Sequence, residues 1–277
     1  MSQGPWSHHS RNASVADDID FEVKGQELQF LEIELDPGES AVAEAGALVW
    51  KDASIAMTTV FGDGSGDTGG GFMGKLLGAG KRLVTGESLF TTVFTHQGTG
   101  KARVAFASPT PGAILPLKLS DVGGTLICQK DSFLAAARGV SIGVAFQRKV
   151  MTGLFGGEGF IMQKLDGDGW VFVQMGGTIV ERELKAGEEL HVDTGCLAAY
   201  TPGVDFDLIM AGGVKTALFG GEGLFFARLR GPGKVWIQSL PFSRLAGRMM
   251  AAAGGGGQNR GEGSVLGGLG DLIGGNN

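Results

Sequence analysis

The chain has 277 residues, of which 43% are hydrophobic and 19% charged, and this balance excludes a broadly disordered protein. Its net charge of −6 disfavours a broad phosphate-binding surface, so nucleic acid is not an expected partner. The 51 glycines follow no collagen-like period and instead predict an all-β fold of many short strands joined by turns and bulges.

The first segment, residues 1–19, is polar and is predicted to be a disordered head. It lacks the apolar stretch of a signal peptide, so we expect a cytoplasmic protein. The chain also lacks a window of about 18 uninterrupted apolar residues, which predicts that no helix spans a membrane. A place at the periphery of a membrane stays open.

Three related segments follow the head, each with a glycine-glutamate unit beside strand-like runs. LFGGEGFIMQKLDGDGWVFVQ at 154–174 aligns without gaps with LFGGEGLFFARLRGPGKVWIQ at 218–238, and 11 of 21 positions are identical. A weaker copy begins at Val84. Such internal similarity predicts a repeat architecture with one shared core. The predicted units are β module 1 over 20–119, β module 2 over 120–184 and β module 3 over 185–240.

Strands are predicted where β-branched and aromatic residues lie between glycines, as in GWVFVQM and KVWIQSL. Gly167-Asp168-Gly169 and Gly231-Pro232-Gly233 stand between apolar runs and are predicted to be hairpin connections. Residues 241–277 follow the last module. Their glycine density makes ordering costly in backbone entropy, so they are predicted to form a flexible tail.

Module 1 is enlarged by an insertion over 60–84, which combines glycines with apolar and basic side chains. One interpretation is an ordered loop that packs on a neighbouring subunit. The other is a contact with a protein partner or a membrane surface, because apolar tips beside lysines suit anionic lipid. The candidate contact residues are Phe72, Met73, Lys75, Leu76, Leu77, Lys81 and Arg82.

Glu87, Glu158 and Glu222 are the acidic residues that recur at one position of the repeat. A glutamate that accepts backbone N–H bonds in a glycine turn would explain this recurrence through the fold alone. The alternative is a ring of carboxylates that binds a small ligand or cation near a pseudo-threefold axis. That site would require the three side chains to converge.

The motifs do not combine into a nucleophile, a base and an orienting group, so no enzyme is expected and no catalytic residue is assigned. No cofactor or metal site is assigned either. Cys128 and Cys196 lie in apolar, strand-like contexts and are expected to be reduced, buried thiols.

The repeated glycine-glutamate units, LVTGESLF at 83–90 and VDTGCLAAY at 192–200 resemble the mitochondrial-biogenesis ("altered inheritance of mitochondria") family from Phe21 to Leu240. The resemblance implies three tandem TRAP-like modules, similar to the tryptophan RNA-binding attenuation protein and grouped with double-stranded β-helices, in a pseudo-threefold arrangement. It also implies a homo-oligomer, with a trimer as the expected form.

The resemblance to this family favours a non-catalytic assembly or scaffold protein that lies adjacent to a membrane. The alternatives are a small-ligand or metal-binding module at the pseudo-threefold axis and a TRAP-like RNA-binding protein. RNA binding ranks lowest, because an acidic chain without a regular basic ladder departs from that pattern.

Overall fold

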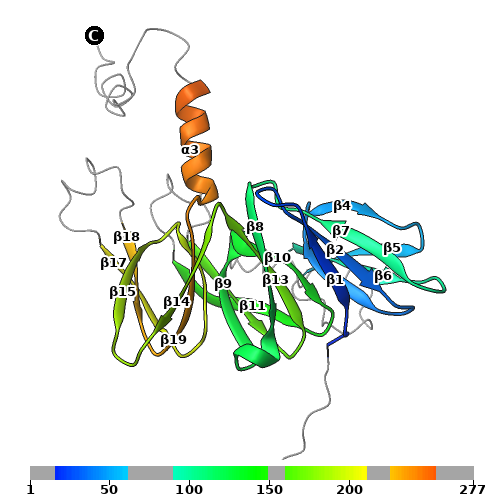
Figure 1. Ribbon diagram of the computed structural model, residues 1–277, viewed down its shortest axis with the longest axis horizontal. Coiled ribbons are helices and arrows are strands. Elements are labelled where there is room, and N and C mark those ends of the chain that lie inside the picture. The colour runs from blue at the N-terminus through cyan, green and yellow to red at the C-terminus, as the bar shows by residue number, and fades with distance from the viewer. Residues whose placement is uncertain (1–15, 62–89, 149–159, 211–224, 254–277) are drawn as a thin grey trace, which may run out of the picture.

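The computed structural model describes residues 16–61, 90–148, 160–210 and 225–253, and these ranges are mostly β (Figure 1). The expectation of a β fold is confirmed at this level. Four antiparallel sheets make up the body. The exceptions are the 3-10 helices η1 (Leu119–Val122) and η2 (Lys130–Ser132) and the helix α3 (Phe242–Ala253).

The first two sheets contain the strands from the N-terminal part of the chain. The first sheet has the order β1 (Asp20–Lys24), β2 (Phe30–Leu35), β7 (Ala102–Phe106), β4 (Leu48–Lys51). The second sheet has the order β5 (Ile55–Phe61), β6 (Phe90–His96), β3 (Ser40–Glu44), β10 (Phe133–Ala137), β13 (Trp170–Gly176), β8 (Gly112–Lys118).

The other two sheets contain the strands from the C-terminal part. The third sheet has the order β11 (Ser141–Arg148), β12 (Phe160–Asp166), β9 (Thr125–Gln129), β16 (Leu197–Tyr200), β19 (Gly233–Gln238), β14 (Ile179–Leu184). The fourth sheet has the order β15 (Glu189–Asp193), β18 (Phe225–Arg230), β17 (Asp205–Met210).

The two predicted hairpins are wrong, because the glycine connections lead from one sheet to another. Gly167-Asp168-Gly169 joins β12 in the third sheet to β13 in the second, and Gly231-Pro232-Gly233 joins β18 in the fourth to β19 in the third. The crossing lets consecutive strands bury side chains in one core: Leu165 of β12 and Val171 of β13 are fully buried in the same cluster. A hairpin would have kept both strands in a single sheet.

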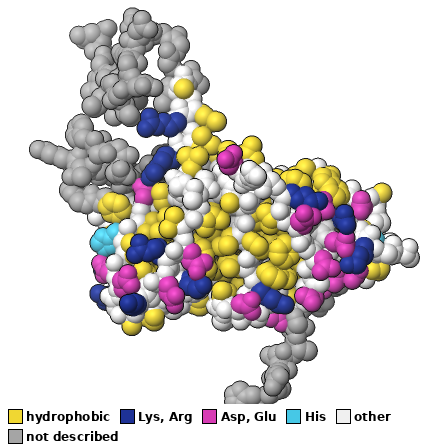
Figure 2. All heavy atoms as spheres, in the orientation of Figure 1, with side chains coloured by type: hydrophobic (Ala, Val, Ile, Leu, Met, Phe, Trp, Pro, Cys, Tyr) yellow, Lys and Arg dark blue, Asp and Glu magenta, His cyan; other side chains and the backbone are white. Residues whose placement is uncertain are grey.

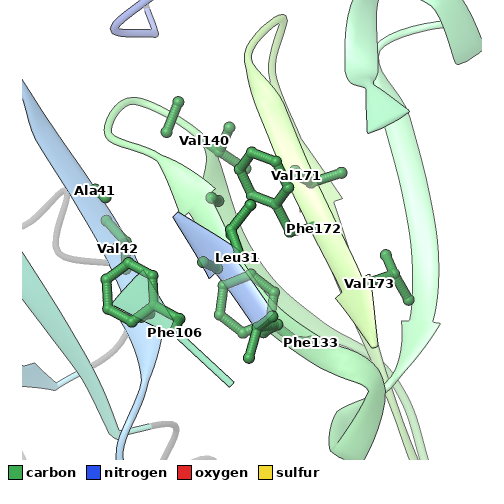
Figure 3. Packing of buried hydrophobic residues seen from close by; sticks show 14 of the residues in the cluster. Leu31, Ala41, Val42, Phe106, Phe133, Val140, Val171, Phe172 and Val173 are labelled. Atoms are coloured by element: carbon green, nitrogen blue, oxygen red, sulfur yellow. The ribbon is translucent and has the colours of Figure 1, made fainter. Parts of the chain in front are cut away.

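The core consists of two clusters of buried side chains between the sheets. In the larger one, Phe94 and Phe106 form an edge-to-face pair with ring centroids 4.9 Å apart. Figure 3 shows Leu31, Phe106 and Phe133 turned toward one interior from different elements. The smaller cluster lies between the third and fourth sheets, where Phe206 stacks on Tyr200. Apolar burial of this kind supplies most of the folding free energy.

The strands β4, β10 and β16 each contain a one-residue irregularity in their pairing. Relative to β7, β13 and β19, the register shifts between Leu48 and Trp50, between Phe133 and Ala135, and between Leu197 and Ala199. A β-bulge inserts one unpaired residue and bends the strand locally. The bulged residues are Val49, Leu134 and Ala198.

Both ends of the body contain order beyond the predicted limits. At the N-terminal end, Ile19 is buried and the Asp17 carboxylate accepts a hydrogen bond from the backbone N–H of Ser40 (2.8 Å). At the other end, α3 occupies the start of the segment predicted to be a flexible tail. Phe242, Leu245 and Met249 repeat at helical spacing, a signal that the glycines of the remaining tail obscured.

The fully buried Phe106 offers a test of the larger core cluster. We expect Phe106→Ala to lower the free energy of unfolding by about 3–5 kcal/mol, because it removes a ring and leaves a cavity. Urea denaturation followed by circular dichroism would measure this loss. Met57→Ala, at a side chain that is 55% exposed, is the control and should change stability by less than about 0.5 kcal/mol. Equal losses in the two variants would contradict the described core.

Candidate functional site

The strand β4 is an outer strand with apolar side chains on its surface. Among the described residues it pairs with β7 on one side only. Leu48, Val49 and Trp50 are 37%, 55% and 38% exposed. Figure 2 shows hydrophobic side chains at the upper right of the molecule, over the end where Figure 1 places β4. Exposed apolar side chains on a strand with unpaired backbone groups mark a surface suited to another chain.

Two other bulged strands lie in a different environment. β10 is flanked by β3 and β13, and β16 is flanked by β9 and β19. Every residue of both strands is buried. The small side chains Ala135 and Ala199 allow these strands to pack closely within their sheets. Among the described strands, β4 therefore differs from β10 and β16 in having one neighbour where they have two.

The strand β15 is the second open edge of interest. In the described chain it pairs only with β18, and it carries polar side chains. Glu189 contacts His191 at 2.9 Å and Arg230 at 3.5 Å. Asp193, at the end of the strand, lies 3.6 Å from Arg244. Figure 1 places β15 and β4 at opposite ends of the long axis. Each of these edges can accept one further strand.

The outer face of the first sheet has a different character from β4. Leu31, Ile33 and Leu35 of β2 point into the core, so Glu32 and Glu34 alternate onto the outer face. There Glu34 contacts Lys101 at 2.7 Å and Arg103 at 2.8 Å. These hydrogen bonds lower the pKa of Glu34 and raise the pKa of Lys101. Such exposed pairs contribute little to stability, but they keep this face compatible with water.

His96 has a structural role. Its side chain is buried, its Nδ1 accepts the backbone N–H of Gly98 at 3.3 Å, and its Nε2 therefore donates to the carbonyl of Gly100 at 2.9 Å. These bonds hold the turn between β6 and β7. His191 lies on the exposed edge of β15. Across the described residues, no group of three or more His, Cys, Asp or Glu side chains is arranged to hold a metal ion.

The two cysteines are buried, as the sequence predicts. Burial raises the pKa of the Cys128 thiol to about 12, so this side chain stays protonated at physiological pH. A protonated, buried thiol is a poor nucleophile and a poor metal ligand.

The candidate residues named from the sequence lie outside the described ranges. These are Glu87, Glu158 and Glu222 of the repeated glycine-glutamate units and Phe72, Met73, Lys75, Leu76, Leu77, Lys81 and Arg82 of the insertion. Their roles stay predictions. Within the described ranges, no helix has both the length and the apolar character needed to cross a bilayer.

Comparison with known proteins identifies the family. A family model described as "Mitochondrial biogenesis AIM24" matches residues 21–240, which hold the sheets and the open edges. The chain belongs to this family. The predicted resemblance is confirmed, and the AIM24 match ends just before α3 begins.

Relatives in Streptococcus pyogenes agree with the AIM24 assignment. An uncharacterized protein of serotype M6 is 30% identical over 230 residues, which cover 82% of this chain and 87% of the relative. A crystal structure of a Streptococcus pyogenes protein matches with a TM-score of 0.66 and 24% identity, and covers 84% of this chain and 99% of that chain. This likeness shows that the two proteins share a fold.

Sequence reasoning missed the exposed edge of β4, although a signal was present. LVWK in β4 has bulky side chains where FLAAA in β10 and LAAY in β16 have alanines. All three strands have a bulge, and the residue after it is Trp50 in β4 but Ala135 in β10 and Ala199 in β16, which indicates different surroundings. That comparison requires the strand register, which the sequence alone did not supply.

Glu44 lies at the end of β3, beside the junction with β10, and its carboxyl group has a perturbed pKa. Burial, and then the negative charge of Asp131, raise this pKa from 4.5 to about 7, while Lys130 partly opposes the shift. The folded protein therefore binds this proton more tightly than the unfolded chain does. Stability falls as pH rises from about 4.5 to about 7, because the carboxylate must then be charged in a partly desolvated place.

Replacing this carboxyl group should remove the pH dependence. We expect Glu44→Gln to match the parent protein near pH 4 and to be more stable by about 1–3 kcal/mol at pH 8. Thermal unfolding at both pH values would measure the difference. Glu27→Gln, at an exposed position, is the matched control and should show no such trend. A stabilisation of equal size at both pH values would contradict this account.

Proposed function

We propose that this AIM24-family chain is a non-catalytic homo-oligomeric assembly protein, built from three tandem TRAP-like modules that continue from one chain to the next. The observation that carries the proposal is the exposed apolar edge of β4, which contrasts with the fully buried strands β10 and β16 of the other sheets.

The strand pairing supports three modules of six strands. In the first, β2–β7–β4 and β5–β6–β3 form two half-sheets. The same pattern recurs as β8–β13–β10 with β11–β12–β9, and as β14–β19–β16 with β17–β18–β15. The bulges also recur at β4, β10 and β16. Because sheet pairing and bulges are set by local geometry, their joint recurrence favours one repeated unit.

The strand pairs that join neighbouring modules indicate how two chains would pair. β3 of the first module pairs with β10 of the second, and β9 of the second pairs with β16 of the third. The next pair in this series is β15 of the third module with β4 of a further first module. Both strands have an open edge in the described structure. A second copy of the chain is therefore the partner that fits both edges.

The internal junctions also define a register. Ala135 lies opposite Ala43, and Ala199 lies opposite Cys128. Trp50 is the first residue after the bulge in β4, as Ala135 and Ala199 are in β10 and β16. Val192 is the fourth residue of β15, as Ala43 and Cys128 are of β3 and β9.

In the proposed junction, Trp50 thus lies opposite Val192 of the next copy. Lys51 lies opposite His191 and diagonal to Glu189. An aromatic–β-branched pair and an opposite-charge diagonal both stabilise adjacent strands.

A contact between two different edges is head-to-tail, so its repetition closes a ring or extends a filament. In a trimer, three chains of three modules each would share one ring. The repeat of modules within each chain would then continue around the ring from one chain to the next.

Disruption of the β4 edge should separate the copies. We expect Val49→Asp to shift the protein from oligomer to monomer, because a buried, unpaired carboxylate costs several kcal/mol at an interface. Light scattering coupled to size-exclusion chromatography would give the mass. Val180→Asp, at a valine that is 44% exposed on β14, is the control and should remain oligomeric. A parent protein that is monomeric at all concentrations would exclude the proposal.

Cysteine cross-linking would test the register. Lys51→Cys and His191→Cys are made in separate chains, mixed and oxidised. We expect a disulfide-linked dimer in the mixture and in neither variant alone, because β4 of one copy meets β15 of another. The native cysteines are buried and should not interfere. Cross-linking of Lys51→Cys alone would indicate a β4–β4 contact and contradict the head-to-tail arrangement.

A further inference from the structure

The helix α3 begins where a further module would start its first strand. Leu28, Gly112 and Gly177 lie at or just before the first strand of each module, β2, β8 and β14. These three residues form a row, because Leu28 makes a parallel bridge with Gly112 and Gly112 makes one with Gly177. After β19 the chain enters α3 and not another strand. The row therefore ends at Gly177 in the described chain.

The proposed junction between copies extends this row. Because the modules continue in series, Leu28 of the next copy would follow Gly177 as Gly177 follows Gly112. The start of α3 already lies at this end of the row, since the backbone N–H of Leu240 donates to the carbonyl of Gly176 at 3.0 Å. The start of α3 and Leu28 of the next copy are therefore neighbours in the proposed assembly.

Leu28 borders an apolar hollow on the first module. The hollow has a volume of about 330 Å³ and is lined by residues at the start of β2, on β4 and in the connection after β7. Leu28 is 71% exposed, and Phe30, Val49 and Trp50 line the hollow with it. The residues of β10 that correspond to Val49 and Trp50 are fully buried. The contrast indicates that a further apolar element covers this hollow.

The helix α3 has an exposed apolar side of its own. Phe242 lines a pocket between α3 and the strand ends of its own chain, and is still 53% exposed. Met249 is 62% exposed and lies about two turns further along the same side of the helix. Met250 points about 100° away from Met249. Figure 1 shows the helix rising from the body, which leaves this side accessible to another copy.

We propose that α3 of one copy packs on the first module of the next copy, with Phe242 and Met249 against the hollow beside Leu28 and Trp50. The inference rests on the proposed function, because it assumes the head-to-tail junction of β15 with β4. A second copy is the occupant that fits, since the junction that pairs the strands also brings these two apolar surfaces together. Their mutual burial adds apolar contact to a junction otherwise made by strand pairing.

Cross-linking between copies would test this contact. Leu28→Cys and Phe242→Cys are made in separate chains, diluted together, reconcentrated and treated with a short bismaleimide. We expect a linked dimer in the mixture and in neither variant alone, because the contact joins two different surfaces. In the control mixture, Met57→Cys on β5, at an exposed position, replaces Leu28→Cys and should give no dimer.

The pair Lys51→Cys and His191→Cys separates this inference from the assembly proposal. A dimer from that pair without one from Leu28→Cys and Phe242→Cys would overturn the α3 contact and leave the strand junction in place. Absence of both dimers would overturn the assembly proposal and the α3 contact together.

Truncation of the helix side chains gives an independent measurement. We expect Phe242→Ala to raise the dissociation constant of the oligomer about tenfold and Met249→Ala about threefold, because each removes apolar surface from the contact. Met250→Ala is the matched control and should associate as the parent does. Light scattering over a dilution series would give these constants. Parent-like association of Phe242→Ala, or equal effects of Met249→Ala and Met250→Ala, would overturn the contact.

Discussion

The hydrogen-bonding edge of a strand is the constraint on which the rest of this structure depends. A strand within a sheet has backbone donors and acceptors on both sides, and each side must meet another strand, a side chain or water. β10 and β16 meet strands on both sides and are buried throughout. In the part of the chain that the structure describes, β4 meets one strand, and its apolar side chains are exposed. The proposed assembly extends to the ends of the chain the pairing that already holds its interior together.

The glycine connections determine which sheet each strand enters. Because β12 leads to β13 and β18 leads to β19 across sheets, each segment of chain contributes to two layers of the core. The apolar runs on either side of the glycines can then bury themselves against each other without sharing a sheet. Strands far apart in sequence become neighbours in this way, such as β3 and β10 or β9 and β16.

The β class, the family and many of the strands could be predicted from the sequence, since they depend on local signals such as glycine spacing and alternating apolar residues. The sheet crossings could not, because Gly167-Asp168-Gly169 has the composition of a hairpin and only its tertiary context separates the two. The exposure of Trp50 also escaped, because it depends on which strands pair in the folded chain.

The strand β1 makes the two edges of the first sheet different from each other. It pairs with β2 along its whole length, from Asp20 opposite Glu34 to Lys24 opposite Phe30, and so covers the side of the sheet farthest from β4. The strands β8 and β14, which hold the place of β2 in the other two modules, have no such extra strand beside them and are terminal in the described sheets. β1 is itself the terminal strand on that flank, and its exposed side chains are the carboxylates Asp20 and Glu22. Because charged side chains on an edge strand disfavour pairing with another chain, this flank resists edge-to-edge aggregation, whereas the apolar edge of β4 does not.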